Sequence, residues 1–128
     1  MTKAIIIVAI LLVIFIIPFI VLSSWGLGTI EKYAIENKSA DWVWRVANIY
    51  SWSFRDERAI ESYTNFMDKY ASDPRYPDAK YRRAVCLTKL VGSKDKAIAE
   101  FNEFADWYPE HPNAVEARKR ASLIKYAR

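Results

Sequence analysis

The 128-residue sequence contains a single cysteine, Cys86, and a single histidine, His111. One cysteine excludes a disulfide framework, and neither residue has the neighbours that a Cys/His zinc site requires. No cysteine lies directly after the apolar run near the N-terminus, so a lipoprotein type of anchor is not expected. Cys86 lies in an apolar-periodic segment and is predicted to be a small buried residue rather than a reactive thiol.

A catalytic set of residues is also missing. His111 lies in a proline-flanked loop with no nucleophile or base nearby in sequence, and we interpret it as a turn residue. Gly26 and Gly28 form no phosphate-binding motif. The carboxylates are scattered at helix starts and outer faces, where the helix dipole and solubility explain them. The sequence therefore predicts no enzyme, no metal, no cofactor and no small-molecule substrate.

The charge balance is only mildly basic, with 19 Lys and Arg against 15 Asp and Glu and a net charge of +4. The basic residues gather near the C-terminus, where Tyr126 is the one aromatic residue among them. Nucleic-acid sites interleave cations with stacking aromatics. We therefore expect no nucleic acid as a partner.

An uncharged apolar run covers residues 4–22. As a helix it is roughly 28 Å long, at about 1.5 Å per residue, which is close to the hydrocarbon thickness of a bilayer. A secretory signal has a shorter apolar region and a small-residue cleavage site. The run therefore predicts an uncleaved membrane span that contacts lipid, although cleavage after Ser23 is a weaker alternative.

The flanking charges give no clear orientation. Lys3 precedes the span, whereas Lys32, Lys38 and Arg45 follow it, so the positive-inside count is ambiguous. Long domains translocate largely regardless of their charge. We expect a single-pass protein of a cell inner membrane, with a cytoplasmic N-terminus and the rest on the periplasmic side.

The rest of the chain repeats an apolar pattern at an offset of 38 residues. Within each copy the spacing places the apolar groups on one face of a helix. Such self-similarity is typical of stacked supersecondary units. The first copy consists of Ala59, Ile60, Tyr63, Phe66 and Tyr70, and the second of Ala97, Ile98, Phe101, Phe104 and Tyr108.

Another helical pattern precedes each copy. In the second pair, Gly92 is expected to take a left-handed conformation and Ser93 to cap the next helix. Pro77 and Pro112 suit the first turn of the helices that follow them. A last amphipathic helix is predicted over about 113–127, and no segment reads as a strand. The two preceding stripes are Val43, Val46, Ala47 and Tyr50, then Tyr81, Ala84, Val85 and Thr88.

On these residues the chain resembles a tetratricopeptide repeat (TPR) protein. Gly92 falls on that family's turn glycine, whereas Phe54 replaces it in the first copy. The amino-acid pattern of the repeat is similar to the repeats of bacterial envelope TPR proteins. The resemblance implies an all-α fold, in which one transmembrane helix precedes a short TPR-like α-solenoid of about two helix pairs and a C-terminal capping helix. The matching residues are Val43, Val46, Ala47 and Tyr50 in a first helix, and Ala97, Phe101, Phe104 and Pro109 in a second.

Three segments are predicted: a transmembrane anchor over 1–24, a juxtamembrane linker or short helix over 25–38, and the TPR-like domain over 39–128. Trp25, Tyr33 and Trp42 are the expected membrane-interface residues, because indole and phenol rings favour the headgroup level. The start of the domain carries more aromatic residues than two helices can bury. The bilayer surface, the short helix or a partner protein is expected to cover them.

The resemblance also implies a groove lined by the first helix of each pair. Its expected partner-binding residues are Trp44, Asn48, Trp52, Arg82 and Lys89. The tryptophans would supply flat apolar anchors and the two cations would attract an acidic peptide. Trp44 stands where a carboxylate clamp has Lys, so recognition of a free C-terminus is not expected. The alternative to partner binding is that the two tryptophans only pack against the membrane-proximal helix.

The leading hypothesis is a non-enzymatic, membrane-anchored scaffold or accessory subunit that contacts other subunits of a larger envelope complex. One alternative is an adaptor that binds peptides transiently in the groove. Another is a homo-oligomer that stacks its acidic and basic ends.

Overall fold

A computed structural model describes residues 1–127 of the chain. Helices are its only regular elements over this range, which confirms the all-α expectation. The seven helices are α1 (Thr2–Leu22), α2 (Ser24–Glu36), α3 (Ala40–Trp52), α4 (Asp56–Lys69), α5 (Tyr76–Thr88), α6 (Lys94–Trp107) and α7 (Ala114–Tyr126).

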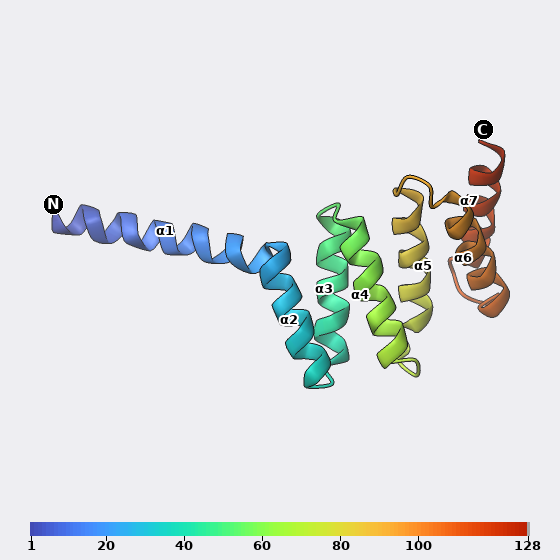
Figure 1. Cartoon of the computed structure of the whole chain (residues 1–128), viewed down its shortest axis with the longest axis horizontal. Helices are drawn as coiled ribbons and strands as arrows, with labels where there is room; N and C mark the ends of the chain where they lie inside the picture. The colour runs from blue at the N-terminus through green and yellow to red at the C-terminus, as the bar shows by residue number, and fades with distance from the viewer. Residues whose placement is uncertain (128) are drawn as a thin grey trace.

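Helix α1 projects away from the other helices, as Figure 1 shows. It continues through Pro18, none of its residues is buried, and it is long and apolar enough to cross a membrane. The helix ends at Ser23, whose extended backbone starts a new direction for α2. The Ser23 hydroxyl accepts a hydrogen bond from the Gly26 amide at 3.2 Å and so caps α2.

The bend between α1 and α2 requires glycine at position 26. A Cβ added to Gly26 would lie 2.3 Å from the Ile20 carbonyl oxygen and 2.7 Å from that of Val21. Both contacts are with backbone atoms, so no side-chain rotation relieves them. The first turn of α2 is therefore held against the last turn of α1, and α2 has little freedom to change its angle.

Helix α2 packs on one side of α3 and buries Tyr50, whereas Trp42, Trp52 and Phe54 stay exposed. Leu27 and Ala34 of α2 are buried in a cluster with Val43 and Ala47 of α3. At the other end of the contact, the Tyr50 hydroxyl donates to the Ser24 carbonyl at 3.1 Å. The juxtamembrane segment is therefore a full helix packed on the domain.

Polar contacts also join α2 to α4. The Glu31 carboxylate is 8% exposed and accepts hydrogen bonds from the Ser62 hydroxyl at 2.8 Å and the Asn65 amide at 3.1 Å. The charge is tolerated because both of its oxygens have donors. The pair of contacts links two helices that are not neighbours in the sequence.

The repeated apolar residues form the core, as the pattern predicted. Tyr63 and Phe66 are fully buried in one cluster, and Phe101 and Phe104 are fully buried in a second. Tyr70 and Tyr108 pack against these clusters at equivalent places. The ring of Phe66 lies 5.6 Å from Tyr70, and that of Phe104 lies 5.7 Å from Tyr108. The two copies thus pack alike as well as matching in sequence.

The turns between helices depart from expectation at two places. Gly92 has the expected left-handed φ of 78°. Ser93 precedes α6 at the N-cap position, but its side chain makes no capping hydrogen bond, so that prediction is wrong. Pro77 lies in the first turn of α5, whereas Pro112 lies before the start of α7 because residues up to Asn113 are still turn.

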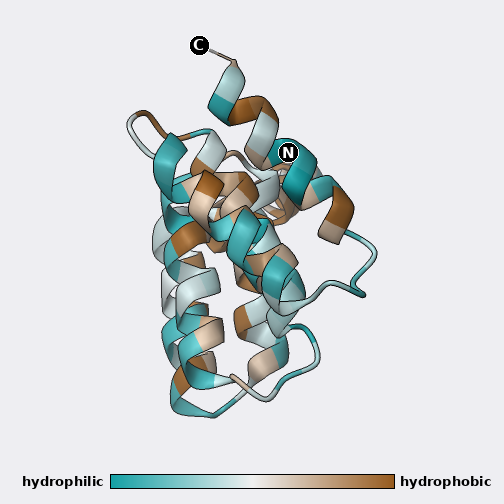
Figure 2. Cartoon of the chain, turned by 90° about the vertical axis from the view of Figure 1, so that its right-hand side faces the viewer, coloured by the Kyte–Doolittle hydropathy of each residue, from teal (hydrophilic) through white to brown (hydrophobic). Residues whose placement is uncertain are grey.

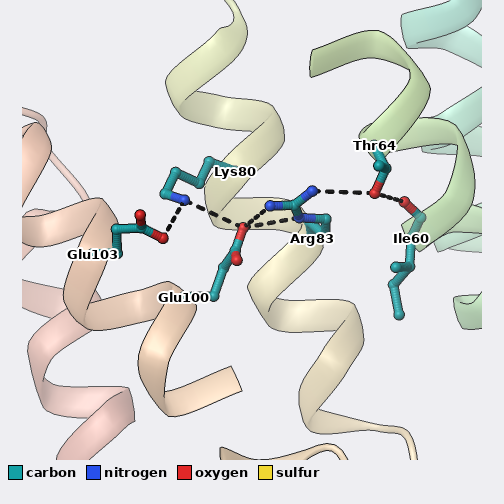
Figure 3. A network of polar contacts seen from close by, with 6 residues as sticks. All are labelled: Ile60, Thr64, Lys80, Arg83, Glu100 and Glu103. Carbon is teal, nitrogen blue, oxygen red and sulfur yellow. Dashed lines mark hydrogen bonds and ion pairs between the residues drawn. The ribbon is translucent and has the colours of Figure 1, made fainter. Parts of the chain in front are cut away.

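A buried ionic network joins α5 to α6 and reaches α4 (Figure 3). The Lys80 side chain is 3% exposed, and its ammonium lies 2.8 Å from Glu103 and 3.6 Å from Glu100. Arg83 donates to the same oxygen of Glu100 and, at 3.1 Å, to the Thr64 hydroxyl. The Trp107 ring covers the ammonium at 4.3 Å. These contacts hold α5 against α6 within one helix pair and, through Thr64, join α5 to α4 of the preceding pair.

The last helix, α7, faces the viewer in Figure 2, with hydrophilic and hydrophobic segments alternating along it. Ala114, Ala117 and Ala121 are buried against the second cluster, on the narrow face that the sequence predicted. The opposite face carries cations but also exposes Val115, Leu123 and Tyr126. The capping helix is therefore less polar on its outer face than a purely solvated end would be.

Candidate protein-binding surface

Three of the five predicted partner-binding residues come together where α3, α4 and α5 meet. The Asn48 side-chain oxygen accepts hydrogen bonds from the Tyr63 hydroxyl at 2.6 Å and from Arg82 at 3.3 Å. The Arg82 guanidinium also stacks over the Trp44 ring at 5.4 Å. Trp44, Asn48 and Arg82 thus form one continuous group.

The Trp44 side chain is partly buried, so only part of its surface can contact a partner. Its ring packs edge-on against Tyr63 at 5.9 Å and against Phe66 at 5.4 Å, and the residue is partly buried. Arg75, held by Asp73 and Asp41, lies over the same ring at 5.9 Å. Trp44 therefore stabilises the core with one face while its remaining surface borders Arg82.

The other two predicted residues lie elsewhere. Trp52 ends α3 and is 74% exposed, with no hydrogen bond or aromatic pair to the Trp44 group in the part of the chain described. The Lys89 ammonium points toward the α3–α4 turn, 3.6 Å from Asp56 and 5.5 Å from the Phe54 ring. These two residues belong to a separate edge of the molecule.

Beside Arg82 lies a hollow of about 340 Å³ between α3, α5 and α7. Arg82 makes no ion pair within residues 1–127, whereas Arg120 is paired with Glu116 at 3.1 Å and Asp78 is hydrogen-bonded to His111 at 3.0 Å. Arg82 is thus the cation available to an anion in the hollow. The lining residues are Ser51, Asp78, Tyr81, Arg82, Val85, Asn113 and Arg120.

The contribution of α7 to this hollow was not predicted. Asn113 and Arg120 come from the last helix, which the sequence analysis treated only as a cap. The signal was available, because the alternation of first and second helices makes α7 a third first helix. Glu31 was missed for another reason: nothing in the sequence distinguishes a carboxylate destined for burial from a solvated one.

His111 lies in a turn and Cys86 is buried, as the sequence predicted. The Asn113 amide donates to His111 Nδ1 at 3.0 Å, so the Nε2 proton faces Asp78 and the imidazole ties the α6–α7 turn to α5. Cys86 is fully buried, and burial raises the pKa of its thiol. Across residues 1–127, no cluster of His, Cys, Asp or Glu could hold a metal ion.

A second surface lies on α2 and the start of α3. The predicted membrane-interface residues Trp25, Tyr33 and Trp42 are 76%, 67% and 53% exposed. An almost wholly apolar hollow of about 470 Å³ is lined by Thr29, Ile30, Tyr33, Ala34 and Trp42. This surface and the Arg82 hollow are lined by different residues, so a partner in one does not compete for the other's side chains.

No protein-family model matches the chain, and no curated protein is significantly similar to it in sequence. Its function is therefore inferred from these two surfaces and from α1.

Proposed function

We propose that the protein is a membrane-anchored scaffold or accessory subunit, in which α1 spans an inner membrane and the following helices form a TPR-like solenoid that binds other subunits. The observation that carries this proposal is the exposure of large apolar side chains outside α1. Beyond the α2 surface these include Trp52 at 74%, Phe54 at 81%, Val115 at 81% and Tyr126 at 76%. Apolar groups spread over both ends of a small domain are typical of a subunit whose neighbours cover them.

The solenoid arrangement is supported by the repeat and by contacts between alternate helices. Glu31 of α2 bonds to Ser62 of α4, and Asn48 of α3 bonds to Arg82 of α5. Each helix also packs against its neighbours in the sequence. Two layers of alternating helices are the arrangement that stacked helix pairs produce. In this reading α2 fills the place of a second helix of a preceding pair.

The size of the native particle tests the scaffold proposal. Membranes from the source organism are solubilised in a mild detergent, and the chain is located on a native gel. We expect a particle much larger than the 14.9 kDa chain in its micelle, with partner chains in fixed proportion. Trp52→Ala should weaken that particle without unfolding the chain, because the side chain is mostly exposed. Lys96→Ala, a change at an exposed position of α6, is the control.

A particle of the chain alone would contradict the scaffold proposal. The Arg82 hollow would then favour the second candidate, a transient adaptor for acidic peptides. Arg82→Gln separates the two functions: the adaptor loses acidic-peptide binding, whereas the scaffold keeps its assembly. Arg118→Gln is the matched control, because Arg118 is exposed on α7 and, within residues 1–127, pairs with Asp106 alone. Protease protection in oriented vesicles tests the periplasmic placement, which requires digestion from that side alone.

A further inference from the structure

The outer face of α2 carries a row of side chains at four-residue intervals. Trp25, Thr29 and Tyr33 follow one another along the helix, and Trp42 of α3 joins them at the apolar hollow. Four-residue spacing keeps the row on one side of the helix over about 12 Å. None of these four side chains is buried by the domain.

The row lies on the same side of α2 as α1. Figure 1 shows α1 on one side of α2 and α3 on the opposite side. Leu27, Glu31 and Ala34 face α3 and α4, which leaves the row turned away from the domain. Only Ser23 separates the two helices, and the close approach at Gly26 fixes their angle. A membrane crossed by α1 would therefore lie against this face.

We infer that the outer face of α2, with Trp42, rests on the bilayer surface at the point where α1 leaves it, and that lipid headgroups are its occupant. The inference rests on the proposed membrane crossing by α1. Trp and Tyr are the residues that favour this depth, with their rings among the acyl carbonyls and their polar atoms toward water. The row begins at Trp25, three residues after the last residue of α1, so it directly adjoins the apolar span.

The charges near the row suit phosphate headgroups. Lys32 lies beside Tyr33 on α2 and is exposed, and the exposed Arg45 holds its guanidinium 5.5 Å from the Trp42 ring. Long cationic side chains keep their stems in the apolar region while the charge reaches the phosphates. Of the two carboxylates of α2, Glu31 is turned inward to Ser62 and Asn65, whereas Glu36 is exposed in the last turn. The interfacial side of α2 therefore combines aromatic rings with two nearby cations, and its one exposed carboxylate lies at the end farthest from α1.

Depth measurements on the full chain test the inference. In a Cys86→Ser background, checked for unchanged helicity, nitroxide labels are placed by Thr29→Cys on α2, Val13→Cys on α1 and Ser122→Cys on α7. The protein is placed at one copy per nanodisc of mixed zwitterionic and anionic phospholipid. We expect the label at 13 to contact oxygen in the acyl region. The label at 29 should collide with aqueous nickel chelate severalfold less than the label at 122.

One copy per disc leaves lipid as the sole material that can shield position 29. A water-exposed label at 13 would reject the membrane crossing itself, and with it the proposed function. A lipid-exposed label at 13 together with equal nickel access at 29 and 122 would overturn the inference alone. Shielding of position 29 that requires several copies per disc would also overturn it, because a second copy would then be the occupant.

A substitution tests whether the aromatic rings hold the surface in place. Tyr33→Ser combined with Trp42→Ser should return the label at 29 to the aqueous phase while the label at 13 stays in lipid. Both side chains are more than half exposed, so the fold is expected to survive. Tyr126→Ser, an exposed aromatic on α7, should leave the depth of position 29 unchanged. An unchanged depth in the double variant would overturn the inference.

Discussion

Phe54 and Gly92 occupy equivalent places in the two copies of the repeat, and both have a left-handed backbone, with φ of 58° and 78°. Each ends the turn between the two helices of a pair. Glycine adopts this conformation without penalty, whereas a side chain with a Cβ does so at a cost of roughly 1 kcal/mol. The geometry of the turn is thus set by the fold and not by the residue that occupies it.

Phe54→Gly should therefore raise the free energy of unfolding by about 1 kcal/mol. The Phe54 side chain is 81% exposed, so little packing is lost when it is removed. Denaturant unfolding of the full chain in detergent, followed by helical circular dichroism, measures the change. Phe54→Ala is the control, because it removes the ring but keeps the strained backbone. Equal stability of the Gly and Ala variants would contradict the explanation.

Substitution of Glu100 is expected to lower the stability of the fold. Its carboxylate accepts two hydrogen bonds from Arg83 and lies 3.6 Å from Lys80, with 13% of the side chain exposed. Glu100→Gln leaves the largely buried Arg83 facing a neutral group, whereas Lys80 keeps its pair with Glu103, and the loss should cost about 2–3 kcal/mol of stability. The same unfolding measurement applies.

Asp106→Asn provides the comparison for Glu100. Its pair with Arg118 joins α6 to α7, and both side chains are more than half exposed. Exposed ion pairs contribute little, so we expect a loss below about 0.5 kcal/mol. If the two substitutions cost the same, burial is not what gives the Glu100 network its strength.

The apolar pattern predicted the helices and the core because both depend on local periodicity. Tyr50, Tyr63, Phe66, Phe101 and Phe104 were assigned to inward faces by spacing alone, and all five are buried. Glycine at position 92 was a local signal for a left-handed turn, although Phe54 shows that the fold imposes the same conformation where that signal is missing. Burial of Cys86 followed from its apolar surroundings in the sequence.

Contacts between distant segments were not predictable in this way. The pairing of Glu31 with Ser62 and Asn65 depends on how α2 lies across α4, which no local pattern encodes. The TPR resemblance groups Trp52 with Trp44, yet Trp52 is the last residue of α3 and is 74% exposed. Two residues on the same face of a helix can differ in burial, because the neighbouring helices do not cover the whole length of that face.

Tyr63 makes stability depend on pH in the alkaline range. Burial raises the pKa of its hydroxyl from 10 to about 12. The unfolded chain releases this proton near pH 10 and the folded chain only near pH 12, so the unfolded state binds fewer protons between these values. Stability therefore falls as pH rises through this window, by up to about 2–3 kcal/mol for a shift of this size.

Tyr63→Phe removes this contribution and should show a correspondingly smaller loss of stability between pH 10 and pH 12. At neutral pH it should cost about 1 kcal/mol, because the hydrogen bond to Asn48 is lost. Urea unfolding at several pH values measures both effects. Tyr33→Phe changes an exposed hydroxyl and should leave the profile as it is. Parallel profiles for the parent chain and Tyr63→Phe would show that another group causes the alkaline loss.

Gly26 and Gly28 offer the sharpest comparison, because they lie two residues apart in the same helix and differ in what surrounds them. A Cβ at position 28 would meet only the Tyr50 hydroxyl, at 3.8 Å, whereas one at position 26 would overlap two carbonyl oxygens of α1. Gly28→Ala should stabilise α2 by about 0.5–1 kcal/mol through the better helix propensity of alanine. Gly26→Ala must instead move α1 relative to α2. Distances between spin labels at position 13 of α1 and position 122 of α7 should shift in Gly26→Ala and stay constant in Gly28→Ala. An unchanged distance in Gly26→Ala would mean that the glycine does not set the bend, and that α2 is free to change its angle to α1.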